Sequence, residues 1–99
     1  MSKMHNKKIW PCYFNDVATG KKKFEIRKND CNYKENDIIV LKEWYDDSDD
    51  LPFSYSGYTG REIIVRIIYK LDNEFMIVDG LDDEYCILGF EILGREGEN

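Results

Sequence analysis

The chain has few of the side chains that usually bind metals or form disulfides. It contains one histidine, His5, and three cysteines, Cys12, Cys31 and Cys86, none of which belongs to a CxxC pair. An odd number of cysteines without that spacing argues against a disulfide framework and against a zinc site. We expect His5 to lie in a frayed N-terminus, so neither a histidine-based catalytic dyad nor a metal or other cofactor is expected.

Long hydrophobic runs are also missing. The longest apolar stretches, near IIV and YCILGF, are much shorter than the roughly 20 residues of a membrane-spanning helix. The N-terminal segment is positively charged, but IWPCYF is too short for a signal peptide and no cleavage pattern follows it. We therefore expect a cytoplasmic protein that makes no contact with a membrane.

The length and the charge distribution limit the possible partners. Ninety-nine residues suit a single domain, which we expect to be ordered over about 7–93, with a disordered tail at 94–99, and to be a monomer. The net charge of −6 combines nine Lys/Arg and three Asp/Glu in residues 1–34 with five and seventeen in residues 35–99. The basic N-terminal part can attract phosphate, whereas long duplex DNA should bind poorly to such an acidic protein.

Apolar periodicity predicts about five strands and one or two short helices, the clear one at residues 11–20. Pro11 suits the first turn of a helix and Gly20 suits its C-terminal cap. The strands are expected at residues 7–10, 22–29, 37–45, 61–71 and 85–93. This content predicts an α+β, mainly β protein, in which a small half-open barrel best covers its own sheet edges.

Alternation along the strands predicts which side chains face the core. In the strand at 22–29, Phe24 and Ile26 are expected inside, with Glu25 and Arg27 on the opposite face. Lys22 can join Glu25 and Arg27 only if the strand bulges or, as we expect, if the chain is still leaving the helix cap there. The predicted interior comprises Phe24, Ile26, Val40, Ile63, Val65, Ile67, Leu88 and Phe90.

The stretch GKKKFEIR, Gly20 to Arg27, resembles the G-x-K-x-x-E-x-R signature of ASCH domains. The stretches IWPCYF, FEIRKND, LKEW, YTGREI and YCILGFEI look like an uncharacterised subfamily of bacteria and their phages. The resemblance covers about Ile9 to Leu93. It implies a PUA-like β-barrel with a helix across one end and an association with RNA, although a fold does not name its ligand.

Two positions depart from the pattern of that subfamily. An arginine often follows KND there, whereas this chain has Cys31, which removes one cation from the expected site. The usual Gly-Asp turn before the next strand is replaced by Asn36 and Asp37. Asparagine tolerates the left-handed backbone conformation, so we expect this second change to cost little.

The resemblance implies a ligand cleft at Lys22, Glu25 and Arg27 for RNA or a nucleotide-like ligand. Arg27 offers a planar fork for phosphate or carboxylate, and Glu25 can hold a cation or accept from a base or ribose. Spacing alone favours an internal salt-bridge network of the kind common on surfaces, so both interpretations stay open. The expected ligand-binding set is Lys22, Glu25, Arg27, Lys28, Trp44 and Tyr58.

The aromatic side chains near the cluster are candidates for base stacking. Trp44, at the end of a predicted strand, is assigned equally to the core and to the cleft, because a tryptophan in a small domain is usually buried. Trp10, before the helix, is favoured less as a cleft residue. Tyr58 lies in a predicted long loop, where an exposed ring can stack on a single-stranded base.

Two other functions remain as alternatives. Some small ASCH proteins that are similar in this motif are amidohydrolases that remove the acetyl group from modified cytidine, using the Lys, a Thr and a further acid. Here Lys22 matches, but Glu25 stands in place of the Thr and favours the charged, non-nucleophilic form of Lys22. The second alternative is an accessory protein that contacts another protein through the acidic run Asp46, Asp47, Asp49 and Asp50, which lacks the spacing of a calcium loop.

Overall fold

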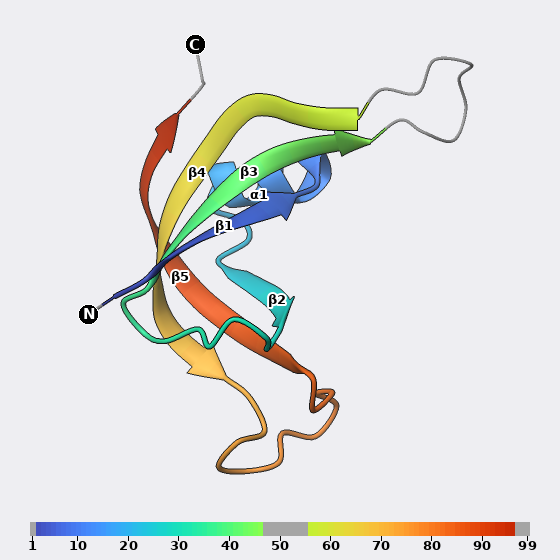
Figure 1. The fold of residues 1–99 in the computed structure, drawn as a ribbon, viewed down its shortest axis with the longest axis vertical. Coiled ribbons are helices and arrows are strands. Elements are labelled where there is room, and N and C mark those ends of the chain that lie inside the picture. Colours follow the sequence, from blue (N-terminus) through green and yellow to red (C-terminus); the bar gives the residue numbers. More distant parts are fainter. Residues whose placement is uncertain (1, 47–55, 97–99) are drawn as a thin grey trace.

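The computed structural model describes residues 2–46 and 56–96 as one curled sheet and one short helix (Figure 1). This confirms the expected α+β, mainly β class. The elements in chain order are β1 (Met4–Ile9), α1 (Pro11–Ala18), β2 (Phe24–Lys28), β3 (Ile38–Asp46), β4 (Ser56–Leu71) and β5 (Tyr85–Glu96).

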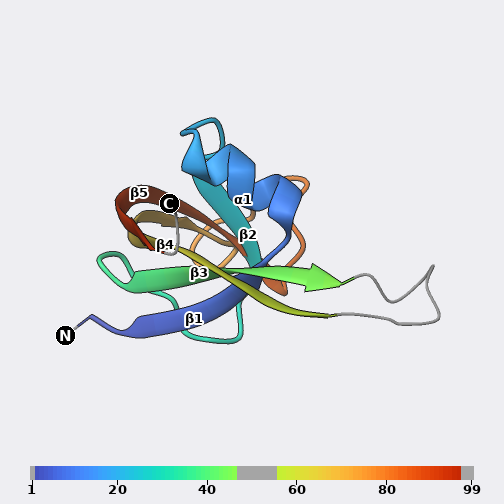
Figure 2. The same cartoon turned by 90° about the horizontal axis from the view of Figure 1, so that it is seen from above.

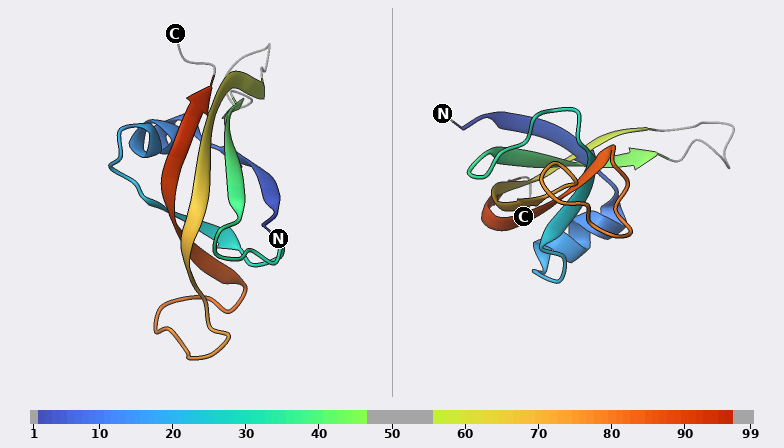
Figure 3. Two further views of the ribbon diagram at one scale, coloured as in Figure 1. Left: turned by 90° about the vertical axis from the view of Figure 1, so that its left-hand side faces the viewer. Right: turned by 90° about the horizontal axis from the view of Figure 1, so that it is seen from below.

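The sheet has the strand order β1-β3-β4-β5-β2. β1 and β3 are parallel, and the other neighbours are antiparallel. The long strands β4 and β5 curve strongly (Figure 3), and their pairing shifts register between Ile64 and Val65 and between Ile67 and Tyr69. Such bulges increase local twist, and the twist closes the sheet into a half-barrel whose two edges are β1 and β2.

The helix forms where the sequence predicts it. Pro11 occupies the first helical turn, and Gly20 follows the last turn with a φ of +80°, the left-handed conformation that glycine adopts without strain. Phe14 and Val17 are fully buried in the core. In Figure 2, α1 lies on the same side of the curled sheet as β2, so the helix covers the region where the two sheet edges approach each other.

The interior agrees with the alternation of β4 and β5 but not of β2. Of the predicted core residues, those on β4 and β5 are buried together, whereas Phe24 and Ile26 are 45% and 56% exposed, so their predicted burial is wrong. Glu25 faces inward instead, because the backbone N–H of Lys22 donates to the Asp16 carbonyl and sets the phase in which the chain enters β2. The core cluster consists of Ile9, Phe14, Val17, Tyr33, Ile39, Leu41, Ile63, Val65, Ile67, Cys86, Leu88 and Phe90.

Val40 is the third difference in the expected interior. It is buried, but Ile39 and Leu41, its neighbours in β3, belong to the core cluster and Val40 does not. Because successive side chains of a strand point to opposite faces, Val40 lies on the other face of the sheet.

Several element boundaries differ from the sequence prediction. β1 begins at Met4, so His5 is part of a strand and not of a frayed end. β4 begins at Ser56, which places Tyr58 in a strand, and β5 continues to Glu96, past the residue where a disordered tail was expected. Asp47, Asp49 and Asp50, together with residues 97–99, lie outside the described residues. Among the described residues, no helix has the length and apolarity to cross a membrane.

Candidate ligand-binding site

A cavity of about 450 Å³ opens at the seam of the barrel, where the two edge strands β1 and β2 meet the first turn of α1. It combines cations, exposed aromatic rings and one carboxylate. The side chain of Arg27 crosses the seam, since its Nη2 donates to the carbonyl oxygen of Lys8 at 2.7 Å. The cavity is lined by Lys8, Ile9, Trp10, Tyr13, Lys22, Phe24, Glu25, Ile26 and Arg27.

Glu25 is the centre of the polar part of this cavity. Its carboxylate is only 5% exposed and binds one cation at each oxygen. Lys22 Nζ donates to Oε1, and Arg27 Nε donates to Oε2 at 3.0 Å. Lys22 reaches Glu25 from the segment that leaves the helix cap, as expected. The structure therefore brings together the three residues of the predicted cluster.

The cluster retains capacity to bind an anion. A guanidinium carries five N–H donors, and the contacts of Arg27 with Glu25 and Lys8 use only part of them. Lys8, Lys22 and Arg27 outnumber the single carboxylate among the residues that line the cavity. The seam thus has an excess of positive charge in a protein whose net charge is −6.

Exposed aromatic rings form the apolar part of the cavity. Trp10 and Tyr13 are 50% and 49% exposed, although rings of this size are usually buried in a small domain. Lys22 Nζ lies 5.3 Å from the ring centroids of both Tyr13 and Phe24, within the range of a cation–π contact. Trp10, the tryptophan that the sequence favoured less, is the one that lines the cavity.

The other predicted site residues lie outside the cavity. Trp44 packs edge-on against Tyr58, with ring centroids 4.9 Å apart, and Lys8 Nζ lies 3.8 Å from the centroid of Trp44. Lys8, which lines the cavity, thus links Trp44 to it. Lys28 is exposed at the end of β2, opposite Tyr85 of β5.

An ion pair between a buried carboxylate on β3 and a partly exposed arginine on β4 was not singled out from the sequence. Glu43 Oε2 lies 2.7 Å from Nη2 of Arg61, and Glu43 Oε1 accepts from the Thr59 hydroxyl at 2.6 Å. The hydrogen bonds from Arg61 and Thr59 lower the pKa of Glu43 despite its burial. Arg61 also contacts α1, donating to Asn15 at 3.2 Å and lying 4.5 Å from the ring centroid of Phe14. The stretches LKEW and YTGREI, which carry the family resemblance, contain both charged partners.

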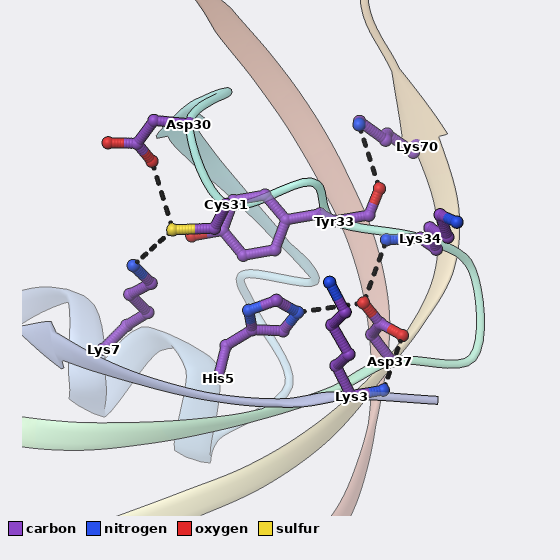
Figure 4. Close-up of polar contacts among 9 residues, drawn as sticks. All are labelled: Lys3, His5, Lys7, Asp30, Cys31, Tyr33, Lys34, Asp37 and Lys70. Carbon is purple, nitrogen blue, oxygen red and sulfur yellow. Dashed lines mark hydrogen bonds and ion pairs between the residues drawn. The ribbon is translucent and has the colours of Figure 1, made fainter. Parts of the chain in front are cut away.

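A second buried pair joins β1 to the start of β3, contrary to the expectation that His5 would lie in a frayed end. His5 Nε2 and Asp37 Oδ2 are 2.9 Å apart, and the ring of His5 packs 4.6 Å from that of Tyr33 (Figure 4). The carboxylate of Asp37 also accepts from the backbone N–H groups of Lys3 and Lys34. These contacts fasten the N-terminal strand to the barrel.

Asn36, just before this carboxylate, has a φ of +75°. This is the left-handed conformation, which asparagine tolerates.

The contacts of the Asp37 carboxylate with His5, Lys3 and Lys34, which we call the Asp37 clasp, predict an acid-sensitive fold. Burial raises the pKa of Asp37, but the hydrogen bonds from His5, Lys3 and Lys34 outweigh it and bring the pKa below the usual 3.8. A lowered folded-state pKa adds stability that is present above pH 3.8 and lost as pH falls through the folded value. Urea unfolding should therefore show Asp37→Asn to be less stable than the parent at pH 7, with a smaller difference at pH 3.

Asp79→Asn is the matched control for this measurement, because Asp79 is exposed in the loop before β5. It should follow the parent at both pH values. Stability curves of Asp37→Asn and the parent that run parallel between pH 7 and pH 3 would show that the clasp does not contribute in its ionised form.

Cys31, which stands where the subfamily often has arginine, lies near the clasp and not in the cavity. Its Sγ accepts from Lys7 Nζ at 3.0 Å and donates to Asp30 Oδ1 at 3.2 Å (Figure 4). The hydrogen bond to Cys31 raises the pKa of Lys7. Within residues 2–46 and 56–96, no group of His, Cys, Asp and Glu side chains is arranged to hold a metal ion.

Comparisons with known proteins place the chain in a family without giving it an activity. The family model described as "Domain of unknown function (DUF3850)" matches residues 4–90. The chain is also 36% identical over 95 residues to a protein of Escherichia phage P2, described as an uncharacterised 12.9 kDa protein in the GpA 3′ region. The match covers 96% of this chain and 73% of the phage protein.

Proposed function

The chain belongs to the DUF3850 family, and we propose that it binds RNA or a nucleotide-like ligand in the cavity at the seam. The observation that carries this proposal is the buried carboxylate of Glu25, which holds Lys22 and Arg27 in place beside exposed aromatic rings. A carboxylate that is already bound to two cations orients their remaining N–H donors instead of repelling an anion.

The composition of the cavity matches the chemistry of a nucleotide. Glu25 and the Lys8 carbonyl contact Nε and Nη2 of Arg27, so Nη1 is the nitrogen that can donate charge-assisted hydrogen bonds to a phosphate. Trp10 and Tyr13 offer ring faces on which a base can stack, and such stacking contributes about 1–3 kcal/mol per base. The volume of about 450 Å³ falls within the range of about 300–1,000 Å³ typical of small-ligand pockets.

The charge distribution favours a short or single-stranded ligand. Three cations and one carboxylate line the seam cavity, while residues 35–99 carry seventeen Asp/Glu against five Lys/Arg. A duplex would extend over this acidic surface, whereas one or a few nucleotides fit beside the cations. The resemblance of GKKKFEIR to the ASCH signature supports the same class of ligand.

Arg27→Ala tests the proposal. Loss of one charge-assisted contact costs about 1.5–3 kcal/mol, so binding of a short single-stranded RNA should weaken roughly 10- to 100-fold. Chemical shifts of the backbone amides of residues 8–10, 12–13 and 22–27 would report binding in an NMR titration with short RNAs and with single nucleotides. Arg27→Lys keeps the charge but not the fork, and should recover only part of the affinity.

Lys28→Ala is the matched control, because Lys28 carries the same charge one residue further along β2 and lies outside the cavity. Its effect should stay within about twofold, as expected of an exposed charge. Equal losses from Arg27→Ala and Lys28→Ala would indicate unspecific attraction. If the amide signals of the cavity residues do not shift when RNA or nucleotide is added, or shift equally in a titration with buffer alone, the proposal is contradicted.

An assay of acetate release from acetylated cytidine distinguishes a binding function from hydrolysis. Acetylated cytidine should bind without release of acetate, because the Lys22 ammonium is paired with Glu25 and is no nucleophile in that state. Acetate release that disappears in Lys22→Arg would replace the binding function with that of an amidohydrolase.

A further inference from the structure

The loop between β4 and β5, residues 72–84, carries three consecutive exposed apolar side chains. Phe75, Met76 and Ile77 are 94%, 78% and 82% exposed. Single apolar residues are common on protein surfaces, but a run of large apolar side chains is unusual and marks interaction sites. We refer to residues 75–77 as the apolar tip.

The loop that presents the apolar tip is held by hydrogen bonds of its own. Asn73 Oδ1 accepts from the backbone N–H of Val78 at 2.6 Å, and Asn73 Nδ2 donates to the Leu81 carbonyl and to Asp83 Oδ1, both at 2.8 Å. These contacts tie both sides of the loop to one side chain. The apolar tip is thus fixed in an outward position before any partner binds, which lowers the entropy cost of association.

Negative charge surrounds the apolar tip. Residues 72–84 contain six Asp/Glu and no Lys or Arg. Beside the tip, a hollow of about 370 Å³ is lined by side chains that accept hydrogen bonds, together with one apolar tip residue. These lining residues are Asn29, Asp72, Asn73, Glu74, Ile77 and Asp83.

We propose that this loop docks onto a partner protein whose surface has an apolar pocket bordered by Lys or Arg. Phe75 and Met76 would enter that pocket, and a basic side chain of the partner would enter the acidic hollow. The negative charge of the loop disfavours nucleic acid and anionic lipid by repulsion. Because the hollow and the seam cavity share no lining residue, and the loop extends away from α1 (Figure 1), the two sites can be occupied together.

A designed peptide can serve as the probe for this surface. An amphipathic helical peptide of leucine and lysine presents an apolar face bordered by positive charge, and two matched peptides replace its lysines with glutamate or its leucines with serine. In an NMR titration, only the Leu/Lys peptide should shift the amides of residues 72–84 and leave those of 22–27 unchanged. Binding that is equal for the Leu/Glu or the Ser/Lys peptide would overturn the proposal.

The variants Phe75→Ser and Ile77→Ser should each weaken binding of the Leu/Lys peptide at least threefold, without a change in melting temperature. Ile68→Ser is the matched control, because Ile68 is also more than half exposed but lies on β4, away from the loop. It should leave the affinity unchanged. Asn73→Ala keeps the apolar tip but removes its hydrogen bonds, and should also weaken binding.

Two further results would overturn the assignment of the occupant. Self-association in sedimentation velocity that Phe75→Ser abolishes would show that a second copy of this chain occupies the tip. Binding to phosphatidylcholine vesicles that depends on Phe75 would show that the tip inserts into a membrane. A protein that stays monomeric, does not bind the vesicles and binds the Leu/Lys peptide would support a basic protein partner.

Discussion

Replacing Phe14 with alanine should lower the free energy of unfolding by about 3–5 kcal/mol, the usual cost of truncating a buried phenylalanine. Phe14 is completely buried and anchors α1 to the barrel, with the guanidinium of Arg61 lying 4.5 Å from the centroid of its ring. Small domains have only about 5–15 kcal/mol in total. We therefore expect Phe14→Ala to be largely unfolded at 37 °C or to melt far below the parent, as circular dichroism would show.

Tyr13→Ala is the control for this prediction, since Tyr13 precedes Phe14 on the same helix but is half exposed in the cavity. It should melt close to the parent and lose affinity for RNA. If Tyr13→Ala lowers the melting temperature strongly and Phe14→Ala lowers it only slightly, α1 buries a different face from the one described.

Phe24→Ala should also lower the free energy of unfolding only slightly. Alternation in the sequence would give it a cost of about 3–5 kcal/mol, but the exposure of its ring predicts much less.

Replacing Arg61 with alanine is the second change with a large expected effect. Glu43 would keep its buried carboxylate with the Thr59 hydroxyl but without its cation. Removing one partner of a buried pair costs about 3–5 kcal/mol, and we expect the lower end, about 3 kcal/mol, because Arg61 is partly exposed. Chemical denaturation at pH 7 measures this loss.

The pH dependence and a double variant identify the cause. In the parent, the lowered pKa of Glu43 contributes stability that is present above its usual value of 4.5 and lost as pH falls through the folded value. Arg61→Ala should therefore differ least from the parent in acid. The double variant Glu43→Gln with Arg61→Ala has the same truncated side chain at position 61 but leaves no unpaired buried charge, so it should recover much of the loss. A double variant as unstable as Arg61→Ala would assign the effect to lost packing against Phe14.

The inward positions of β4 and β5 are the ones that the sequence predicts best. Ile63, Val65 and Ile67 of β4 and Leu88 and Phe90 of β5 recur at every second position and are buried in the core, while other apolar residues of these strands, such as Ile68 and Leu93, are exposed. β2 is different, because FEIRK alternates equally well in either phase at the edge of a sheet. Its phase depends on the bond from the Lys22 N–H to the Asp16 carbonyl, which no pattern within the strand reveals.

Among the polar clusters, the sequence likewise predicts those whose residues lie close together in the chain and misses those whose residues lie far apart. Lys22, Glu25 and Arg27 lie within one turn and strand, so a local motif finds them. The pairs Glu43–Arg61 and His5–Asp37 join residues 18 and 32 positions apart. Their contact requires the registers of β3 with β4 and of β1 with β3, and a single sequence does not specify such registers.

The position of β2 in the sheet determines when the site can form. Among the described strands, β2 is an edge strand whose neighbour is β5, so Lys28 can pair with Tyr85 only after the much later residues of β5 have been made. Contacts between distant segments form late and slow the folding of a chain. The carboxylate at the seam is therefore buried only when β5 has docked. A ligand that requires this arrangement acts on the finished domain and cannot guide the growing chain.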